Sequence, residues 1–190
     1  KRLMDRIKER EYDIIVIEAG INDIILPYIQ NQSIIKKAYV HRVRKRDSIV
    51  TPIEKFGKVL DQALKCIRKK TKAQVIVTTL SCVGEDLESE LNNKRKNIND
   101  QIKKVTRKHN LTIADVGSKF DSFLKKHKSS NYLIGSSLSF IIDLIRLKNT
   151  SRIDNISRKR KLHLTFDGVH LNSKGAKIYS DEIMKHLKLR

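Results

Sequence analysis

The chain has 190 residues, of which 39% are hydrophobic and 33% charged, and its formal net charge at pH 7 is +20. Apolar residues in this proportion, arranged in periodic runs, exclude a disordered chain and suit one domain, which we expect to span residues 1–190. No apolar run reaches the roughly 20 residues of a transmembrane helix. Two cysteines are too few for a disulfide framework, and we expect Cys66 and Cys82 to be buried free thiols.

The first part of the chain predicts one strand between more polar segments. Residues 3–10 read as the end of an amphipathic helix, and the apolar run 12–19 predicts a buried, parallel strand that ends at Gly20. Residues 21–29 are expected to lead into a connection, and residues 36–46 are a strongly basic stretch.

A well-marked helix is expected to follow. Thr51 is its expected N-cap, Pro52 stands at the first helical position, and Glu54 completes a capping box. The apolar stripe of this helix is formed by Ile53, Phe56, Leu60, Ala63, Leu64 and Ile67. The apolar run 74–80 then predicts the second strand.

Acidic residues between positions 85 and 90 predict the start of the next helix, because carboxylates favour the positive end of the helix dipole. Its expected buried face consists of Leu87, Leu91, Ile98, Ile102 and Val105. A short third strand is predicted at 111–116, an apolar helix at 133–147 and a basic connection at 152–161. The region 129–161 has the character of an insertion.

The last helix is predicted to begin at Asn172 or Ser173. Its expected buried face consists of Ala176, Tyr179, Ile183 and Leu187. Strands that alternate with long helices predict an α/β fold with a parallel sheet and right-handed crossovers. In such sheets functional groups gather at the carboxyl ends of the strands.

The motif Gly20-Ile21-Asn22-Asp23 follows the first predicted strand. Gly20 permits a sharp turn, and the side-chain amide of Asn22 is a neutral N–H donor that stabilises an oxyanion without acting as a base. The alternative is that Asn22 and Asp23 only form a turn or cap the next helix, and the motif taken alone favours this alternative.

The second motif is Asp167-Gly168-Val169-His170. A tight turn at Gly168 would place Asp167 beside His170, where a carboxylate fixes the imidazole tautomer and stabilises the imidazolium. We expect an Asp167–His170 hydrogen bond of about 2.6–3.2 Å, and we expect this pair to converge with Asn22 at one edge of the sheet. The alternatives are a helix-capping surface loop and a fragment of a metal site, although no further ligands stand at metal-binding spacing nearby.

Together, the two motifs resemble sequence blocks of the SGNH (GDSL) hydrolase family. Gly20-x-Asn22-Asp23 is similar to the third block, and residues 164–176 (LTFDGVHLNSKGA) are similar to the fifth, which carries the Asp-x-x-His pair. The resemblance covers nearly the whole chain. It implies a flavodoxin-like, three-layer α/β/α fold with a parallel sheet.

The resemblance also implies a role for each site residue. His170 would be the general base and Asp167 would orient it. Asn22 would donate a hydrogen bond to the oxyanion, and Gly20 would shape the turn that presents Asn22.

The nucleophile of the family stands in a Gly-Asp-Ser block on an earlier strand, and these 190 residues contain no such block. We therefore expect the N-terminal strands and the nucleophilic serine to be missing from the chain. Ser81 and Ser118 also follow predicted strands, but neither stands in the sharp turn that a nucleophile needs.

The resemblance implies a serine ester hydrolase that forms an acyl-enzyme: an acylesterase, a lipase or a carbohydrate O-deacetylase. No metal or cofactor is expected. The alternative is a non-catalytic anion-binding module on the same fold, which lacks the nucleophile. The basic segments 36–46 and 158–161 suit an anionic ester substrate or a membrane or cell-wall surface, but the pattern favours the alternative, a solvated face. No specific nucleic-acid partner is expected, since one tyrosine is no stacking platform; compartment and oligomeric state are left open.

Overall fold

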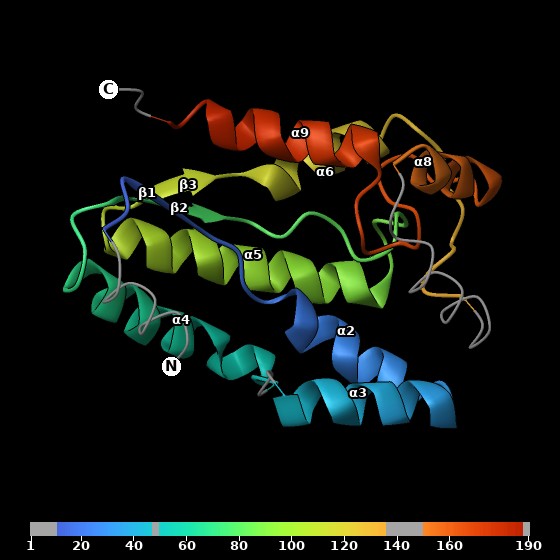
Figure 1. The fold of residues 1–190 in the computed structure, drawn as a ribbon, viewed down its shortest axis with the longest axis horizontal. Helices are drawn as coiled ribbons and strands as arrows, with labels where there is room; N and C mark the ends of the chain where they lie inside the picture. The colour runs from blue at the N-terminus through green and yellow to red at the C-terminus, as the bar shows by residue number, and fades with distance from the viewer. Residues whose placement is uncertain (1–10, 47–49, 136–149, 188–190) are drawn as a thin grey trace.

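The computed structural model describes residues 11–46, 50–135 and 150–187, and its centre is a parallel three-stranded sheet (Figure 1). The strands lie in the order β1 (Ile14–Ile17), β2 (Gln74–Thr78) and β3 (Thr112–Ala114). The three predicted strands are therefore confirmed, although each is shorter than its apolar run. The predicted helix at 3–10 lies outside the described residues.

Burial along the strands follows their place in the sheet. Val75, Ile76 and Val77 of β2 are buried, because β2 has a strand on each side and helices over both faces. In the described part of the chain β1 pairs only with β2; its Ile15 is buried, whereas Val16 is 44% exposed. β1 is therefore an edge strand with one face on the core and the other open to solvent.

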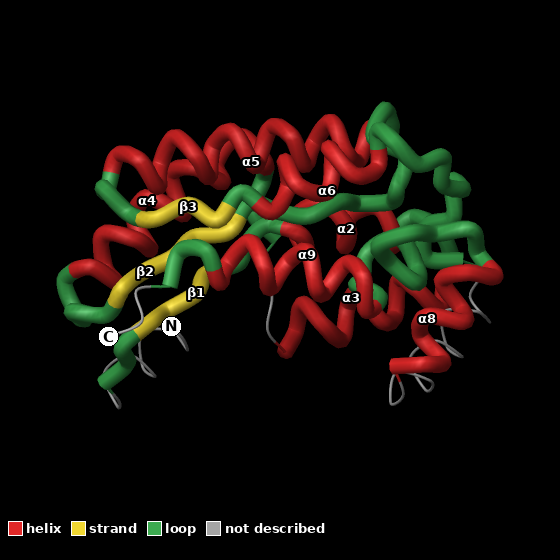
Figure 2. Tube along the Cα trace, turned by 90° about the horizontal axis from the view of Figure 1, so that it is seen from above, coloured by secondary structure: helices red, strands yellow, loops and turns green. Residues whose placement is uncertain are grey.

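The described residues form seven helices around the sheet. They are α2 (Ile21–Gln30), α3 (Ile34–Arg46), α4 (Ile53–Arg68), α5 (Glu90–Lys108), α6 (Val116–Leu124), α8 (Thr150–Lys159) and α9 (Ser173–Met184). Helices α4 and α5 cover one face of the sheet and α6 and α9 the other, so the fold has three layers (Figures 1 and 2). The predicted α/β/α arrangement is confirmed.

Two hydrophobic clusters hold these layers together. The larger one lies between the sheet, α4 and α5 and includes Ile15, Val77, Phe56, Leu64, Ile98 and Ile102. The smaller one lies under α6 and α9 and consists of Cys82, Val116, Phe120, Leu124 and Leu164. Among the helices of the described ranges, none is long and apolar enough to cross a membrane.

All three strands point toward the same end of the molecule. In Figure 1, β1 leads directly into α2, and the loop after β2 runs toward the segment between α8 and α9. Helices α3 and α8 also lie at this end. The carboxyl edge of the sheet is therefore where segments far apart in the sequence come together.

Three segments for which no helix was predicted are helical. Residues 21–30 form α2 because their apolar side chains pack on the larger cluster. The basic stretch forms α3, in which Val40 and Lys36 face inward, and the basic segment after residue 150 forms α8. Helix α6 was not predicted at all. Of the helix predicted at 133–147, residues 133–135 are not helical and the others lie outside the described residues.

Two predicted helix starts are wrong. Pro52 is the N-cap of α4 without a side-chain cap, so the capping box of Thr51 and Glu54 does not form. Helix α5 begins at Glu90 after the N-cap Ser89. The acidic residues before Ser89 therefore lie in a loop, and one of them, Glu85, is buried.

Two predictions about burial are also wrong, whereas the cap of the last helix is confirmed. Cys82 is buried as expected, but Cys66 is exposed. In α9, Gly175 faces the core and Ala176 is exposed. The helix lies so close to Leu164 at this point that a side chain at Gly175 would strike the Leu164 carbonyl. Asn172 caps α9 by accepting the Gly175 N–H at 2.9 Å.

Candidate active site

The turn after β1 is built on Gly20. Its φ of +118° is strained for other residues, and a side chain there would meet Ile98 and Phe56. This turn lets α2 begin immediately, with Asn22 exposed in its first turn. Gly20 therefore forms the turn between β1 and the start of α2, where Asn22 stands.

Asp23 has a structural partner. Its carboxylate accepts the backbone N–H of Thr51 at 2.6 Å, which ties the turn after β1 to the start of α4. Burial raises the pKa of Asp23 from its ordinary value, and the hydrogen bonds from Thr51 offset part of this rise.

The second motif forms a closed turn. Thr165 and Leu171 are joined by an isolated antiparallel bridge, and Gly168 at the tip has a φ of +90°. A side chain at Gly168 would meet the Tyr132 carbonyl at 2.9 Å, so only glycine fits. The turn therefore returns the chain tightly enough to place Asp167 and His170 side by side.

Asp167 and His170 form the expected hydrogen bond. Nδ1 of His170 lies 2.7 Å from Oδ2 of Asp167, and Oδ1 accepts the backbone N–H groups of Val169 and His170 at 2.9 and 2.8 Å. The His170 side chain is 62% exposed, whereas that of Asp167 is 9% exposed. The pair thus consists of a buried carboxylate that orients an imidazole at the surface.

The environment of Asp167 favours its charged form. Burial alone would raise the pKa of the carboxyl group, but the hydrogen bond and charge of His170 and the two backbone N–H groups outweigh it, so the pKa lies below the ordinary value of 3.8. Asp167 is therefore ionised at neutral pH and stabilises a proton on His170.

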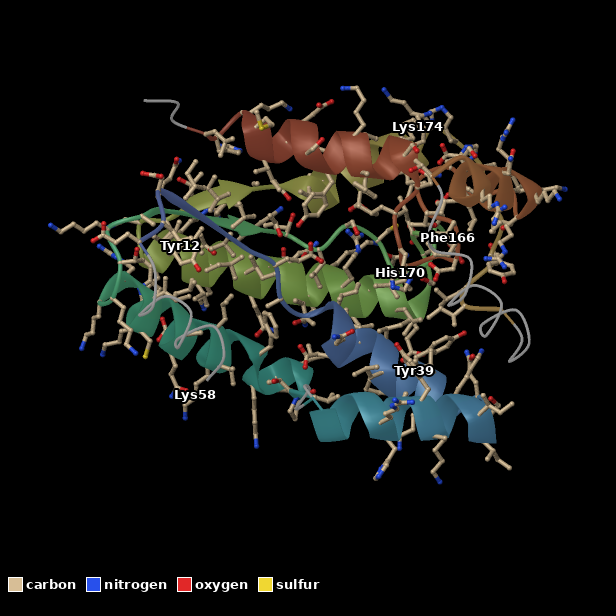
Figure 3. The ribbon with its side chains drawn as sticks, viewed as in Figure 1. Tyr12, Tyr39, Lys58, Phe166, His170 and Lys174 are labelled. Carbon is tan, nitrogen blue, oxygen red and sulfur yellow. The ribbon has the colours of Figure 1, made fainter. Side chains whose placement is uncertain are left out.

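Figure 3 shows His170 beside α2, the helix that carries Asn22 in its first turn. The ring of Phe166 stacks against His170 with centroids 5.7 Å apart. The Gly84 N–H donates to the Gly168 carbonyl at 2.6 Å, which seats the turn against the loop after β2. The two predicted motifs are therefore brought to the same end of the sheet.

A buried carboxylate that was predicted to stand at a helix start also belongs to this region. Glu85, 4% exposed, accepts hydrogen bonds from the backbone N–H groups of His163, Leu164 and Thr165, all within 2.7–2.8 Å. It also accepts the hydroxyls of Thr165 and Ser129. Glu85 was missed because an acidic residue near a helix start is ordinarily exposed.

Helix α5 holds the loop that carries Glu85. Asn92, Arg95 and Asn99 are buried on one face of α5 and bind the backbone of residues 80–86. Arg95 also forms an ion pair with Asp121 at 2.7 Å. The helical spacing of these polar residues was the available signal, but only the fold shows that this face is buried.

Basic residues around the site are partly structural. Lys36 of α3 is buried, and its ammonium donates to the carbonyls of Ile134 and Gly135 at 2.8 and 2.6 Å; burial lowers its pKa. Arg160 donates to the Phe166 carbonyl at 2.8 Å and lies over the Tyr132 ring. These two cations therefore hold backbone in place.

The two candidate serines have other surroundings. Ser81 is 9% exposed, and its carbonyl accepts from Arg95. The Ser118 hydroxyl donates to Asp115, the N-cap of α6, at 2.7 Å. In the ranges that the structure covers, no three His, Cys, Asp or Glu side chains are grouped to hold a metal ion.

The fold and the site define a class of protein: a three-layer α/β/α hydrolase with an Asp–His pair beyond the carboxyl edge of its sheet. The chain belongs to the GDSL-like lipase/acylhydrolase family, whose model matches residues 1–183. No curated protein matches the sequence.

Solved structures share the fold at low sequence identity. An acetyl xylan esterase, AlAXEase, has a TM-score of 0.60 at 18% identity over 98% of this chain and 72% of its own. Axe2, an acetylxylan esterase from Geobacillus stearothermophilus, has a TM-score of 0.61 at 13% identity over 100% and 65%. LAE5, an α/β hydrolase from the metagenome of Lake Arreo, Spain, has a TM-score of 0.59 at 15% identity over 97% of this chain and 63% of its own. The chain thus spans 63–72% of the length of these three proteins.

Proposed function

We propose that this chain supplies the general base and an oxyanion donor of a serine ester hydrolase. His170 removes the proton of a serine hydroxyl, whose oxygen attacks the ester carbonyl. The tetrahedral oxyanion accepts a hydrogen bond from the Asn22 amide. The ester bond then breaks, the alcohol leaves with the proton from His170, and water releases the acyl group by the same route.

The observation that carries this proposal is the 2.7 Å hydrogen bond between Asp167 and Nδ1 of His170. A proton on Nδ1 leaves Nε2 as the basic nitrogen, and an ionised Asp167 stabilises the imidazolium formed when Nε2 accepts a proton. The high exposure of the imidazole suits a base that must reach a substrate.

The position of Asn22 supports its role as the oxyanion donor. It is exposed in the first turn of α2, at the end of the sheet where the Asp167–His170 turn also lies. Asp23 is bound to Thr51, so the neighbouring carboxylate has a structural partner. Asn22 remains the neutral donor of the motif.

The structural neighbours support the same roles and suggest a substrate to test. Variants of Axe2 that are described as catalytic mutants replace a serine, an aspartate and a histidine. The aspartate and histidine stand three positions apart, as do Asp167 and His170. Acetyl esters of carbohydrates are therefore our first candidate substrates.

The test compares the 190-residue chain with a version extended at its N-terminus by an apolar strand that ends in Gly-Asp-Ser. Acetate release from p-nitrophenyl acetate and acetylated xylooligosaccharides is measured for both. We expect background rates from the 190 residues alone and turnover from the extended chain. His170→Ala abolishes turnover, and Asn22→Ala lowers kcat by about 10²–10³, the loss typical of one oxyanion donor.

The matched control is Asn31→Ala, which removes an exposed asparagine at the other end of α2 and leaves kcat unchanged. Strong hydrolysis by the 190-residue chain alone would contradict the proposed nucleophile and point to Ser81 or Ser118. An extended chain that folds but releases no acetate would instead favour the anion-binding module.

A further inference from the structure

Glu85 is a buried carboxylate outside the Asp167–His170 pair, and most of its hydrogen bonds come from the segment that leads to this pair. Oε1 accepts the N–H groups of Leu164 and Thr165 and the Thr165 hydroxyl, at 2.7, 2.8 and 2.8 Å. Oε2 accepts the His163 N–H and the Ser129 hydroxyl, both at 2.7 Å. Five donors therefore converge on one carboxylate.

The arrangement of donors requires a carboxylate. Three consecutive backbone N–H groups point at the same side chain, and such a concave row of donors favours an anion. A glutamine would turn an NH₂ group toward at least one of them, because both carboxylate oxygens accept a backbone N–H. A buried N–H without an acceptor is costly, so the charge of Glu85 matches what the segment presents.

The loop that carries Glu85 is itself fixed. Asn92 of α5 accepts the Val83 N–H at 3.1 Å and donates to the carbonyls of Val83, Gly84 and Asp86. The loop is therefore anchored to the longest helix of the described residues. Through its hydrogen bonds, Glu85 ties residues 163–165 to this fixed loop.

The contacts of Glu85 lie directly beside the Asp–His turn. Thr165 forms the bridge with Leu171 that closes the turn, two residues before Asp167. The adjacent Gly84 N–H donates to the Gly168 carbonyl at the tip of the turn. The loop after β2 thus binds this turn at two places: at its beginning, through Glu85, and at its tip, through Gly84.

We infer that Glu85 is the positioning residue of the Asp167–His170 pair: its carboxylate fixes residues 163–165 so that the turn presents His170 with Nδ1 on Asp167. The importance of this for turnover rests on the proposed function, but the positioning itself does not. Glu85 acts through the backbone of residues 163–165, whose N–H groups its carboxylate accepts.

The test follows the His170 ring by NMR in the 190-residue chain, so it needs no turnover. The ¹⁵N shifts of the ring report which nitrogen carries the proton, and the exchange rate of the Nδ1 proton reports its hydrogen bond to Asp167. We expect Glu85→Gln to speed this exchange roughly tenfold or more, as loss of a charge-assisted hydrogen bond implies. Amide exchange at Leu164 and Thr165 should rise with it.

The matched control is Glu182→Gln, which neutralises a buried carboxylate of α9 that pairs with Lys185. It should leave the His170 ring signals unchanged. If Glu85→Gln does not fold, Thr165→Val removes one donor to Glu85 without a change of shape and should produce a smaller shift in the same direction.

A folded Glu85→Gln protein with wild-type His170 signals would overturn the inference, as would a Thr165→Val protein with unchanged signals where Glu85→Gln does not fold. Altered signals without ester hydrolysis by the extended chain would instead sustain the positioning role and reject the proposed function. In an active extended chain, Glu85→Gln lowers kcat more than it changes KM, because the base is misplaced while the substrate surface is intact.

Discussion

At the scale of single residues, the site depends on the hydrogen bonds that the buried carboxylate of Asp167 accepts. Asp167 is buried, yet its pKa lies below the ordinary value, because His170 and two backbone N–H groups outweigh the effect of burial. The same contacts that keep Asp167 ionised also orient the imidazole. Charge and geometry at this position are therefore inseparable.

Asp167→Asn should destabilise the protein in a pH-dependent way. The pKa of Asp167 is lower in the folded state than in the unfolded state, so its stabilisation is complete above the ordinary pKa of 3.8 and disappears as the pH falls through the lowered folded value. The difference in free energy of unfolding between wild type and variant should thus be present at pH 7 and shrink below about pH 4. Urea unfolding at several pH values measures this difference. Asp100→Asn on the exposed side of α5 is the control, and a gap that persists unchanged at pH 2 would contradict the prediction.

At the scale of secondary-structure elements, α5 has two functions. Its apolar face packs on the sheet and α4, whereas Asn92, Arg95 and Asn99 hold the loop after β2. Polar residues are tolerated in this interior because the loop backbone satisfies them. Helix α5 therefore both stabilises the sheet and shapes the carboxyl edge where the site lies.

Asn92→Ala should cost about 2–4 kcal/mol of unfolding free energy, since it strips the hydrogen bonds of a buried loop and leaves backbone groups unsatisfied. Amide exchange at Val83, whose N–H binds Asn92, should rise more than exchange in β2. The neighbouring Asn93→Ala provides the control, because Asn93 is exposed. Equal stability of the two variants would show that the loop is held by other contacts.

At the scale of the whole molecule, the two sides of the sheet differ. In the described residues β1 and β3 are the two outer strands, but no residue of β3 is exposed, whereas Val16 of β1 is 44% exposed. An exposed apolar edge favours association with another strand. We therefore expect the 190-residue chain to self-associate through this edge.

Val16→Thr should reduce self-association while changing the unfolding free energy by less than about 1 kcal/mol, because it replaces an exposed apolar side chain with a β-branched polar one. Ile15→Thr, one position along the strand, should cost about 2–4 kcal/mol, because it places a hydroxyl in the core. Light scattering against concentration and urea unfolding measure the two effects. Unchanged scattering in Val16→Thr would show that the exposed Val16 side chain does not drive the association.

The sequence by itself determined the parts of this protein that depend on short-range chemistry. Apolar runs indicated all three strands, because strands of parallel sheets in α/β proteins are rich in apolar residues. Gly168 between Asp167 and His170 indicated the tight turn and the hydrogen bond, because these groups are covalently close. Asn172 indicated the start of α9, because an N-cap acts within one helical turn.

Only the tertiary structure decided the roles that depend on distant partners. Helices α2, α3 and α8 were not predicted, because their sequences have basic or irregular patterns. Packing against other parts of the fold stabilises them. Glu85 was predicted to stand at a helix start, yet it lies in a loop and is buried because backbone donors about 80 residues away converge on it. A local pattern records the preference of a residue for water or core, but it does not record which partner satisfies a buried charge.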